Sequence, residues 1–304
     1  MTPRSFTFLV NPASGGGAAP QAVVPVAAKL REGGATVDVT YSPGPKAMGA
    51  LVAAAVDKGD VVVSVGGDGM LSSLAGLVAK AQGTLAVVPA GRGNDFARML
   101  GLPEDPTELA TLLLEKEVRQ VDLVRLTLPG GAEPRIVAGS VYCGIDARAG
   151  EIVDKAHWLP SKLQYPYAAL RAMAAYKPGR FIVSVDGDER RFEASNVVVA
   201  NSAYYGKGMK IAPAAKVDDG LLDVVVIEAA SKLSLMKSLP KVYDGQHIHL
   251  DAVTVLTGTR VELRADASRP VPIGGDGEPL GSVPPQCGQP AVVELLPGAL
   301  SVIA

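Results

Sequence analysis

Two glycine-rich turns that carry acidic residues are the part of this sequence best suited to chemistry. The apolar residues 61–65 run into Gly66-Gly67-Asp68-Gly69, and residues 85–88 run into Pro89-Ala90-Gly91-Arg92-Gly93-Asn94-Asp95. Glycine permits positive φ and lets main-chain N–H groups approach an anion. The N-terminus of a following helix adds partial positive charge. Both turns therefore indicate a site for phosphate groups.

Asp68 is the unusual residue of the first turn, because a carboxylate beside phosphates is repulsive. It is tolerable if a divalent cation bridges it to the phosphates, or if it accepts hydrogen bonds from a ribose or substrate hydroxyl. Mg²⁺ typically takes one or two carboxylates together with substrate phosphates. The alternative is a tight turn between strand and helix in which Asp68 caps the helix.

Two further acidic segments lie in the second half of the chain. Asp218-Asp219-Gly220-Leu221 has the form of a hard-cation site, and Asp276-Gly277-Glu278 offers a carboxylate that could accept a proton from a hydroxyl group. Either segment can equally be an ordinary Asp-Gly turn. His247 and His249 have no acidic or thiol companions nearby, so we expect them at the surface and not in a metal site.

The elements that must position these turns alternate between strand and helix. Strands are predicted at residues 5–10, 36–40, 61–65 and 85–88, with helices at 21–31, 46–58 and 70–81. This alternation predicts an α/β fold with a doubly wound parallel sheet, whose strand ends form a ligand crevice.

After about residue 120 the pattern changes to a β-rich, sandwich-like second domain. Strand-like segments occur at 137–145, 180–185, 192–200 and 222–227, with a hairpin turn at 129–131, and helices are predicted at 150–157, 162–176 and 232–243. We therefore expect two domains, residues 1–122 and 123–290.

Composition excludes several classes of protein. The chain has 304 residues with 29 Lys and Arg against 31 Asp and Glu, a net charge of -2, which argues against a nucleic-acid binder. Cys143 and Cys287 are far apart and read as reduced thiols of a cytoplasmic protein. No run approaches the roughly 18 to 20 apolar residues that span a bilayer, and we expect no signal peptide.

Taken together, the motifs resemble those of the bacterial diacylglycerol kinase-like lipid kinases. Gly66-Gly67-Asp68-Gly69 resembles the nucleotide signature of diacylglycerol and sphingoid lipid kinases and, more distantly, of NAD kinases and phosphofructokinases. The other similar segments are Val10-Asn11-Pro12-Ala13-Ser14-Gly15, Pro89 to Arg98, Asp218 to Asp223, and Asp276-Gly277-Glu278-Pro279. The matches are in order and span nearly the whole chain.

The resemblance implies a set of site residues. For ATP these are Asn11, Pro12, Ser14, Gly15, Thr40, Gly66, Gly67, Asp68, Gly69, Arg92, Gly93, Asn94 and Asp95. It implies a structural Mg²⁺ held by Asp219 and by backbone oxygens of Lys216 and Leu221. It places the catalytic acids at Asp68 and at Asp276 or Glu278, the choice of general base being left open. Arg92 stands where relatives often have Thr, and Met70 where they have Thr or Ser.

The resemblance further implies that residues 291–304 return to pack on the first domain. The expected activity is ATP-dependent transfer of the γ-phosphate to diacylglycerol, giving phosphatidic acid, with transient membrane contact of a cytoplasmic enzyme. A sphingoid or other lipid-alcohol kinase, an NAD kinase, and a non-catalytic nucleotide- or lipid-sensing protein remain alternatives. There is no Gly-x-Gly-x-x-Gly after a strand and no Walker motif. Oligomeric state stays open, with a homodimer as one option.

The aromatic stretch 158–167 collects Trp and Tyr around a lysine. Aromatics mixed with basic groups suit an interfacial surface or a lipid entrance. Ordinary core packing followed by a proline turn is the favoured interpretation.

Overall fold

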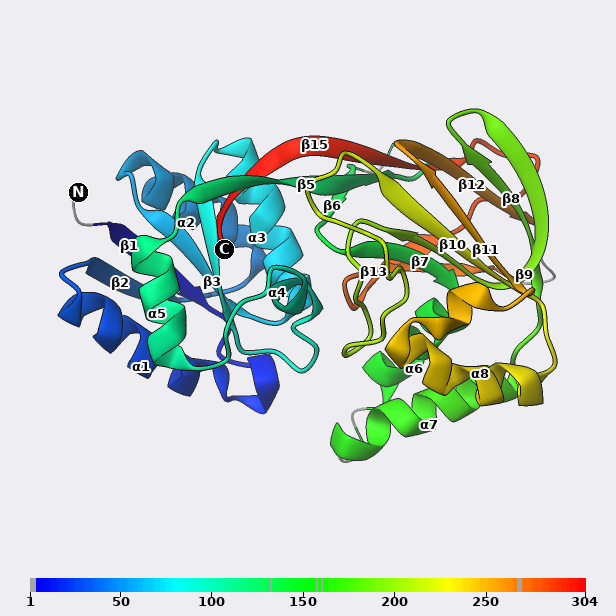
Figure 1. Ribbon diagram of the computed structural model, residues 1–304, viewed down its shortest axis with the longest axis horizontal. Coiled ribbons are helices and arrows are strands. Elements are labelled where there is room, and N and C mark those ends of the chain that lie inside the picture. The colour runs from blue at the N-terminus through cyan, green and yellow to red at the C-terminus, as the bar shows by residue number, and fades with distance from the viewer. Residues whose placement is uncertain (1–3, 132, 157, 160, 267–269) are drawn as a thin grey trace.

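The computed structural model describes residues 4–131, 133–156, 158–159, 161–266 and 270–304. Two halves lie side by side, and the strands β5 (Val118–Thr127) and β15 (Ala291–Ile303) run across both of them (Figure 1). The strands of the described residues join into one sheet of fifteen strands.

A parallel sheet in the order β4-β3-β1-β2 forms the N-terminal half. Its strands are β1 (Ser5–Val10), β2 (Thr36–Tyr41), β3 (Val61–Gly66) and β4 (Thr84–Pro89). Its helices are α1 (Ala19–Glu32), α2 (Pro45–Asp57), α3 (Asp68–Lys80), α4 (Asp95–Met99) and α5 (Pro106–Glu115), with the short 3₁₀ turn η1 (Ser14–Gly16) before α1. The central strands are apolar on both faces because helices cover both: α1 and α5 pack on one face, α2 and α3 on the other.

The C-terminal strand β15 joins the two halves. Its first part pairs with β5 and with β12 (Arg260–Asp266), and its last residues pair in parallel with β4. The register shifts around residues 297–299, where the Gly298 N–H donates to Asp122 Oδ1 at 2.7 Å. The other oxygen of Asp122 accepts from the Gly220 N–H at 2.9 Å. The last residues of β15, from Leu300 on, thus pack on the N-terminal half, whereas Ala291, Val293 and Leu295 belong to the core of the second half. The domain boundaries predicted after residues 122 and 290 stay predictions, and the first of them falls within β5.

The second half is a mostly antiparallel array around a Val-rich core. Its remaining strands are β6 (Arg135–Val137), β7 (Ser140–Gly144), β8 (Gly179–Val185), β9 (Asp188–Ala200), β10 (Leu222–Glu228), β11 (Val253–Gly258), β13 (Pro272–Gly275) and β14 (Glu278–Ser282). Three helices lie together along one side of it: α6 (Ile145–Lys155), α7 (Ser161–Ala174) and α8 (Lys232–Asp244), the last followed by η2 (Gln246–His249) (Figure 1). The α/β fold with a β-rich second part is confirmed.

Most element predictions agree with the structure, but the single strand predicted at 137–145 is divided: Val137 ends β6, and residues 140–144 form β7. The chain leaves β6 after Val137, bends at residues 138–139, and re-enters the sheet as β7; Ile145 already begins α6. The bend arises because the main-chain N–H groups of residues 138–140 turn toward a carboxylate, that of Asp276, instead of a strand. At the other end Gly144 adopts φ 108°, which ends the strand.

Two interpretations of single side chains also change. His247 was expected at the surface but is 1% exposed, with its Nε2 3.0 Å from the Ile211 carbonyl oxygen, because α8 and η2 fold it under the chain. Trp158 was expected in the core but is 70% exposed, in edge contact with Tyr167 at 5.7 Å between ring centres. Pro160, in the same stretch, lies outside the described residues. Both cysteines are free thiols.

Candidate active site

Two glycine turns touch at the carboxyl ends of β3 and β4. The strands are parallel neighbours, and Gly66 pairs with Pro89 at their ends. A Cβ on Gly91 would overlap the Cα of Gly67, so this approach requires glycine. Main-chain atoms of these glycines, without side chains over them, therefore form the bottom of the predicted crevice between the adjacent strands.

The turn after β1 reaches the same place. Because β1 and β3 are parallel neighbours, residues 11–17 leave the sheet beside the Gly66 turn. The Ser14 Oγ lies 3.3 Å from where a Cβ of Gly66 would be, and a Cβ of Gly15 would lie 2.7 Å from the Ala90 carbonyl oxygen. Gly15 also adopts φ 63°, which favours glycine. Three turns thus converge on one surface.

The other residues predicted to bind ATP at this end of the sheet lie less close to the point where the three turns converge. Asn11 closes its own turn, with its Oδ1 accepting from the Ala13 N–H at 3.0 Å, and Pro12 is exposed. Thr40 lies in the edge strand β2, paired with Leu9. Thr40 is therefore at the rim of the turn cluster and not at its centre.

Asp68 begins α3 and is half-buried among like charges. Its Oδ1 accepts from the Phe96 N–H at 3.3 Å. Burial, followed by the negative charges of Asp276 and Asp95, raises the pKa of Asp68 to about 7. At neutral pH this carboxyl is close to its midpoint, so a nearby cation would complete its ionisation.

Gly93 separates two carboxylates. A Cβ there would lie 2.9 Å from Asp68 Oδ2 and 3.1 Å from Asp95 Oδ2. Both oxygens therefore face one small volume, and any side chain at position 93 would fill it.

Asp95 joins the N-terminal half to a loop of the second half. Its carboxylate accepts from the main-chain N–H groups of Lys207 at 2.9 Å and Gly208 at 2.7 Å, and it pairs with Arg98 at 2.8 Å. Asp95 is 8% exposed. The Asp95 side chain, implied by the resemblance to bind ATP, is thus engaged with protein donors.

Asp276 is held by four donors from both halves. Its Oδ2 accepts from the Ser72 hydroxyl of α3. The same oxygen accepts from the N–H groups of Ala138 and Gly139, both at 2.9 Å, and Oδ1 accepts from the Ser140 N–H at 2.9 Å. Burial raises the pKa of Asp276, and these hydrogen bonds oppose the rise. An ionised carboxylate offers about four lone-pair sites, so this one is close to fully used. It also adopts φ 45°, a conformation that L-residues rarely take.

Glu278 lies across the junction against the first glycine turn. It is exposed at the start of β14, and its Oε1 would lie 2.5 Å from a Cβ at Gly69. The structure thus brings the acid of the C-terminal motif to the turn that opens α3. Of the two acids, Glu278 is the one exposed beside the glycine turns.

A buried polar group supports the turn that carries Glu278. The Gly277 N–H donates to the Tyr142 hydroxyl at 3.1 Å, and the Tyr142 ring contacts Tyr205 edge-on at 5.7 Å. Tyr205 and Asn196 both donate to the Asp146 carboxylate at the start of α6. Burial raises the pKa of Asp146, and these two donors lower it.

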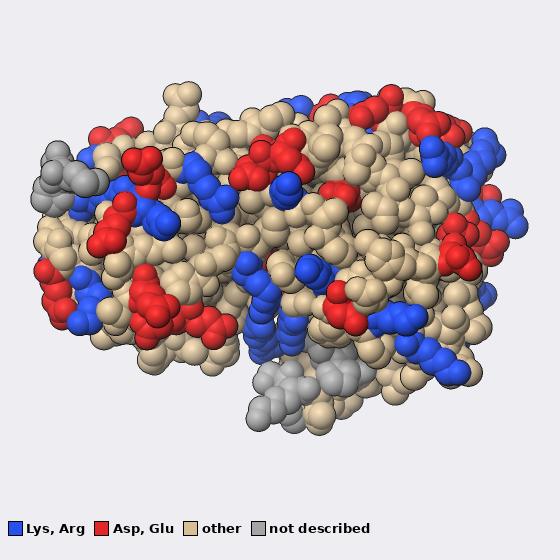
Figure 2. Space-filling model, viewed as in Figure 1, with Lys and Arg blue, Asp and Glu red and all other residues tan. Residues whose placement is uncertain are grey.

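Cationic side chains face the junction from both halves. Arg92 Nη1 donates to the Gln164 Oε1 of α7 at 3.4 Å. Burial and then the Arg92 charge lower the pKa of Lys207, so the two cations are near each other. Figure 2 shows Lys and Arg side chains along a notch between the halves. This notch suits a polyanion.

The residues predicted to bind a structural cation lie in the loop before β10. Asp219 Oδ1 accepts from the Leu221 N–H at 3.1 Å. Burial, followed by the Asp219 charge, raises the pKa of Asp223, so two carboxylates are close. With carbonyl oxygens of Lys216 and Leu221 the donors are all hard oxygen atoms, which fit Mg²⁺ or Ca²⁺. Among the described residues, no group of three or more His, Cys, Asp or Glu side chains could hold a metal ion.

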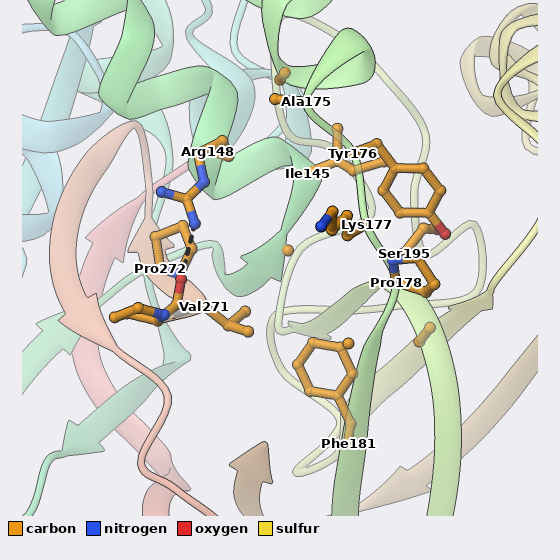
Figure 3. A pocket seen from close by; sticks show the side chains of 15 residues that line it. Ile145, Arg148, Ala175, Tyr176, Lys177, Pro178, Phe181, Ser195, Val271 and Pro272 are labelled. Atoms are coloured by element: carbon orange, nitrogen blue, oxygen red, sulfur yellow. Dashed lines mark hydrogen bonds between the residues drawn. The ribbon is translucent and has the colours of Figure 1, made fainter. Parts of the chain in front are cut away.

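A separate pocket lies between α6, the end of α7 and the sheet of the second half (Figure 3). Ile145, Phe181 and Val271 supply apolar surface, and Arg148 and Lys177 supply charge. Arg148 Nη2 donates to the Pro270 carbonyl at 2.7 Å, the dashed line of Figure 3. None of the residues predicted from the sequence lines this pocket.

Three contributors to the site were missed from the sequence. Ser72 lies four residues after Asp68 on α3, a spacing that places both on one helix face. Lys207 stands between Gly206 and Gly208, a glycine-flanked lysine that could have been singled out. Tyr142 carries no local signal, because its role comes from a contact with Gly277.

Comparisons with known proteins agree along the whole chain. A model of the diacylglycerol kinase catalytic domain matches residues 5–126, and one of the YegS C-terminal NAD kinase beta sandwich-like domain matches residues 139–304. A protein named diacylglycerol kinase from Mycobacterium tuberculosis (strain ATCC 25618 / H37Rv) is 32% identical over 303 residues, covering 98% of this chain and 94% of that protein. "Probable lipid kinase YegS-like" of Xanthomonas euvesicatoria pv. vesicatoria is 30% identical over 272 residues, with 82% of each covered.

The fold also matches a solved structure. The crystal structure of a diacylglycerol kinase from Bacillus anthracis str. Sterne superimposes with a TM-score of 0.68 at 20% identity, covering 99% of this chain and 96% of that one. At this identity the likeness concerns the fold alone.

Proposed function

The chain belongs to the bacterial diacylglycerol kinase-like lipid kinases, and from this we propose that it transfers the γ-phosphate of ATP to the hydroxyl group of diacylglycerol, forming phosphatidic acid. One observation carries the proposal: the Glu278 carboxylate, from the second half, lies against Gly69 of a glycine turn in the first. Phosphoryl transfer needs both parts, a cradle for phosphates and a base for the acceptor hydroxyl.

The triphosphate of ATP is held on the three converging turns. Main-chain approach is open there because Gly66, Gly67 and Gly91 lack side chains, and Gly67 and Gly91 pack directly on each other. Arg92 and Lys207 face the same junction and balance the phosphate charge. Arg92, where relatives often have Thr, supplies a planar donor set that can bind phosphate bidentately.

Glu278 accepts the proton from the attacking hydroxyl group. It is exposed beside the turn, whereas Asp276 is held by four donors. Asp276 is then a positioning residue: it fixes the turn that carries Glu278 to α3 and to the β6–β7 bend. Tyr142 holds the same turn through the Gly277 N–H.

Asp68 and Asp95 are the groups that would meet a divalent cation accompanying ATP. Their Oδ2 atoms face one small volume beside Gly93. Burial, followed by the charges of Asp276 and Asp95, raises the pKa of Asp68. A bound Mg²⁺ would supply charge neutralisation for the phosphates. Asp219, with carbonyl oxygens of Lys216 and Leu221, would hold a second, structural Mg²⁺ outside the cleft.

The test is a product assay with labelled ATP and mixed lipid acceptors, resolved by thin-layer chromatography. We expect labelled phosphatidic acid from diacylglycerol and, for Glu278→Gln, a kcat lowered by about 100- to 10,000-fold with unchanged ATP binding. The matched control is Glu133→Gln, an exposed Glu in the β5–β6 connection. If the wild-type enzyme labels no diacylglycerol, the assignment of diacylglycerol as acceptor is wrong. If the Glu278→Gln variant stays fully active, the assignment of Glu278 as general base is wrong.

Another lipid alcohol is the second candidate for the acceptor. A relative named as a YegS-like lipid kinase, and not as a diacylglycerol kinase, is 30% identical to this chain. The same assay, run with sphingosine and other lipid alcohols beside diacylglycerol, decides between them.

A further inference from the structure

A short hairpin of the second half enters the junction beside the glycine turns. Tyr205 and Met209 exchange two main-chain hydrogen bonds, each at 3.0 Å, and a tight turn joins them. All the residues of this turn have positive φ: 58° at Gly206, 70° at Lys207 and 89° at Gly208. Glycine adopts this conformation freely, whereas a residue with a side chain rarely does. A conformation of this kind persists only where the surrounding structure determines it.

On the side of the first half, Asp95 determines the conformation of the hairpin. Its carboxylate accepts from the N–H groups of Lys207 at 2.9 Å and Gly208 at 2.7 Å. The oxygen that accepts from Lys207 is Asp95 Oδ2, which also faces Asp68 Oδ2 beside Gly93. The main chain of Lys207 is therefore one hydrogen bond away from the small volume between the two carboxylates.

On the side of the second half, Asp146 anchors the hairpin. The Tyr205 hydroxyl and Asn196 Nδ2 both donate to Asp146 Oδ2. Asn196 Oδ1 accepts from the Asp146 N–H at 3.3 Å, in the first turn of α6. Burial, followed by the Asp146 charge, raises the pKa of Tyr205 well above its ordinary value, so its hydroxyl stays protonated and remains a donor. The hairpin is thus tied to α6 through one side-chain hydrogen bond.

The same support reaches the turn that carries Glu278. Tyr142, in edge contact with Tyr205, accepts from the Gly277 N–H at 3.1 Å. A Cβ on Gly274 would lie 2.6 Å from the Tyr142 ring, so β13 packs directly on that ring. The hairpin and the Glu278 turn therefore have a common support, and both enter the junction from the second half.

We propose that Lys207 binds the γ-phosphate of ATP and that Asp146, through Tyr205, positions it there. This rests on the proposed function, since it assigns one phosphate group of ATP to one cation of the junction. In-line transfer places the γ-phosphate between the phosphates on the glycine turns and the base that takes the acceptor proton. The second half supplies that base, Glu278, and it supplies Lys207 at the same junction. An ammonium group there stabilises the charge of the transition state.

The first experiment is calorimetry of the full chain with Mg²⁺ and either ADP or AMP-PNP, the non-hydrolysable analogue of ATP. Lys207→Met and Lys207→Gly should each lower AMP-PNP affinity about tenfold and leave ADP affinity unchanged, because only AMP-PNP carries a γ-phosphate. The urea midpoint of Lys207→Gly should not fall, since glycine favours this φ. Lys210→Met is the matched control: the Lys210 Cδ lies 3.5 Å from where a Cβ of Gly245 would be, at the end of α8. If Lys207→Met binds AMP-PNP as wild type does, the γ-phosphate contact is wrong.

The second experiment tests the positioning role of Asp146. Tyr205→Phe keeps the ring and removes only the hydroxyl, so AMP-PNP affinity should fall about threefold with ADP affinity unchanged. Asp146→Asn should change the two affinities in the same way. In a Lys207→Met background, Tyr205→Phe should have no further effect on either affinity. Tyr204→Phe, which keeps its ring under Arg98, is the matched control.

A purely structural role of Asp146 and Tyr205 predicts a different result. Both variants would then lower the urea midpoint and leave the ratio of AMP-PNP to ADP affinity at its wild-type value. That outcome in Tyr205→Phe would overturn the positioning role, even if Asp146→Asn fails to fold.

Nucleotide binding is measured without a lipid, which separates this inference from the proposed acceptor. If wild type labels no diacylglycerol while Lys207→Met loses affinity for AMP-PNP alone, the acceptor is wrong and the γ-phosphate contact stands. If wild type labels diacylglycerol, the kcat of Lys207→Met should fall about 100-fold. An unchanged kcat would overturn the role of Lys207 in transfer.

Discussion

Asp68 and Asp276 are two carboxyl groups with raised pKa values at the same junction, and they differ in how many donors hold them. Asp276 accepts from one hydroxyl and three main-chain N–H groups. Asp68 accepts from two main-chain N–H groups, those of Phe96 (3.3 Å) and Asp95, and faces the charges of Asp276 and Asp95. Burial raises both pKa values. Burial alone therefore does not distinguish the two carboxylates. Asp276 is close to fully hydrogen-bonded, whereas Asp68 has fewer donors and more room for a new partner.

The same contrast explains why the two acids of one motif divide their tasks. Asp276 ties α3 of the first half to the β6–β7 bend of the second, so it sets the geometry of the cleft. Glu278, two residues later, points across to Gly69 from an exposed position. A motif of three residues thus supplies both an anchor and, in our proposal, a base.

The largest expected effect is loss of stability in Asp276→Asn. The amide would turn an NH₂ group toward N–H donors, leaving buried groups unpaired, so the free energy of unfolding should fall by about 3 to 5 kcal/mol. Urea unfolding followed by circular dichroism measures this. Glu278→Gln is the control and should unfold as wild type does. An Asp276→Asn protein that is fully stable yet inactive would break the comparison and make Asp276 the base.

Asp68→Asn should change stability in the opposite direction, and only above acidic pH. The folded-state pKa of about 7 exceeds the ordinary 3.8, so folding favours the protonated form. That contribution is fully present below pH about 4 and is lost as the pH rises through 7. A shift of about three units corresponds to about 4 kcal/mol, and partial exposure reduces this to about 2 kcal/mol.

The measurement is urea unfolding of metal-free protein across this pH range. The stability of Asp68→Asn relative to wild type should rise between pH 4 and 7 and level off above, while its kinase activity falls. Asp38→Asn, at an exposed acid paired with Lys58, should show no such trend. If the difference in unfolding free energy between Asp68→Asn and wild type does not change with pH, the ionised Asp68 carboxylate must be as well hydrogen-bonded as that of Asp276.

Much of the first half of this molecule could be predicted from sequence because its signals are local. Runs such as residues 61–65 and the turns that end them fall within a residue or two of the observed strands. In the second half the decisive contacts are remote. The bend at residues 138–139 depends on Asp276, more than 130 positions away, and no local pattern contains it.

The candidate site divides in the same way. Residue types and spacing indicated Gly66–Gly69 as a phosphate site, and the family resemblance implied an acid in Asp276-Gly277-Glu278 with the choice between Asp276 and Glu278 left open. The donors that hold Asp276 are main-chain groups of another segment. The burial of His247 likewise depends on the Ile211 carbonyl, which sequence spacing does not reveal. Sequence motifs locate acids, whereas hydrogen-bond partners assign their tasks.

Gly93→Ala should have a smaller effect than either acid substitution. The new Cβ would lie 2.9 Å from Asp68 Oδ2 and 3.1 Å from Asp95 Oδ2, so both carboxylates must move, at a cost of about 1 kcal/mol. ATP affinity, measured by calorimetry with Mg²⁺ present, should fall about tenfold for the same reason. Gly150→Ala on α6, where a Cβ meets nothing within 4 Å, is the matched control. Unchanged ATP affinity would contradict the proposal that a divalent cation binds between Asp68 and Asp95.

Gly69→Ala should leave stability within about 0.5 kcal/mol of wild type, because its Cβ meets only the flexible end of an exposed side chain. It should still lower kcat about tenfold, since the Glu278 carboxylate must move by roughly an ångström from its position. If displacement of Glu278 is the whole cause, Gly69→Ala should have no effect on kcat in a Glu278→Gln background, and a double-mutant cycle measures this coupling. Additive losses would mean that Gly69 acts on the phosphates alone. The contact between Gly69 and Glu278 would then have no part in catalysis, and the proposed division of tasks between Asp276 and Glu278 would fail.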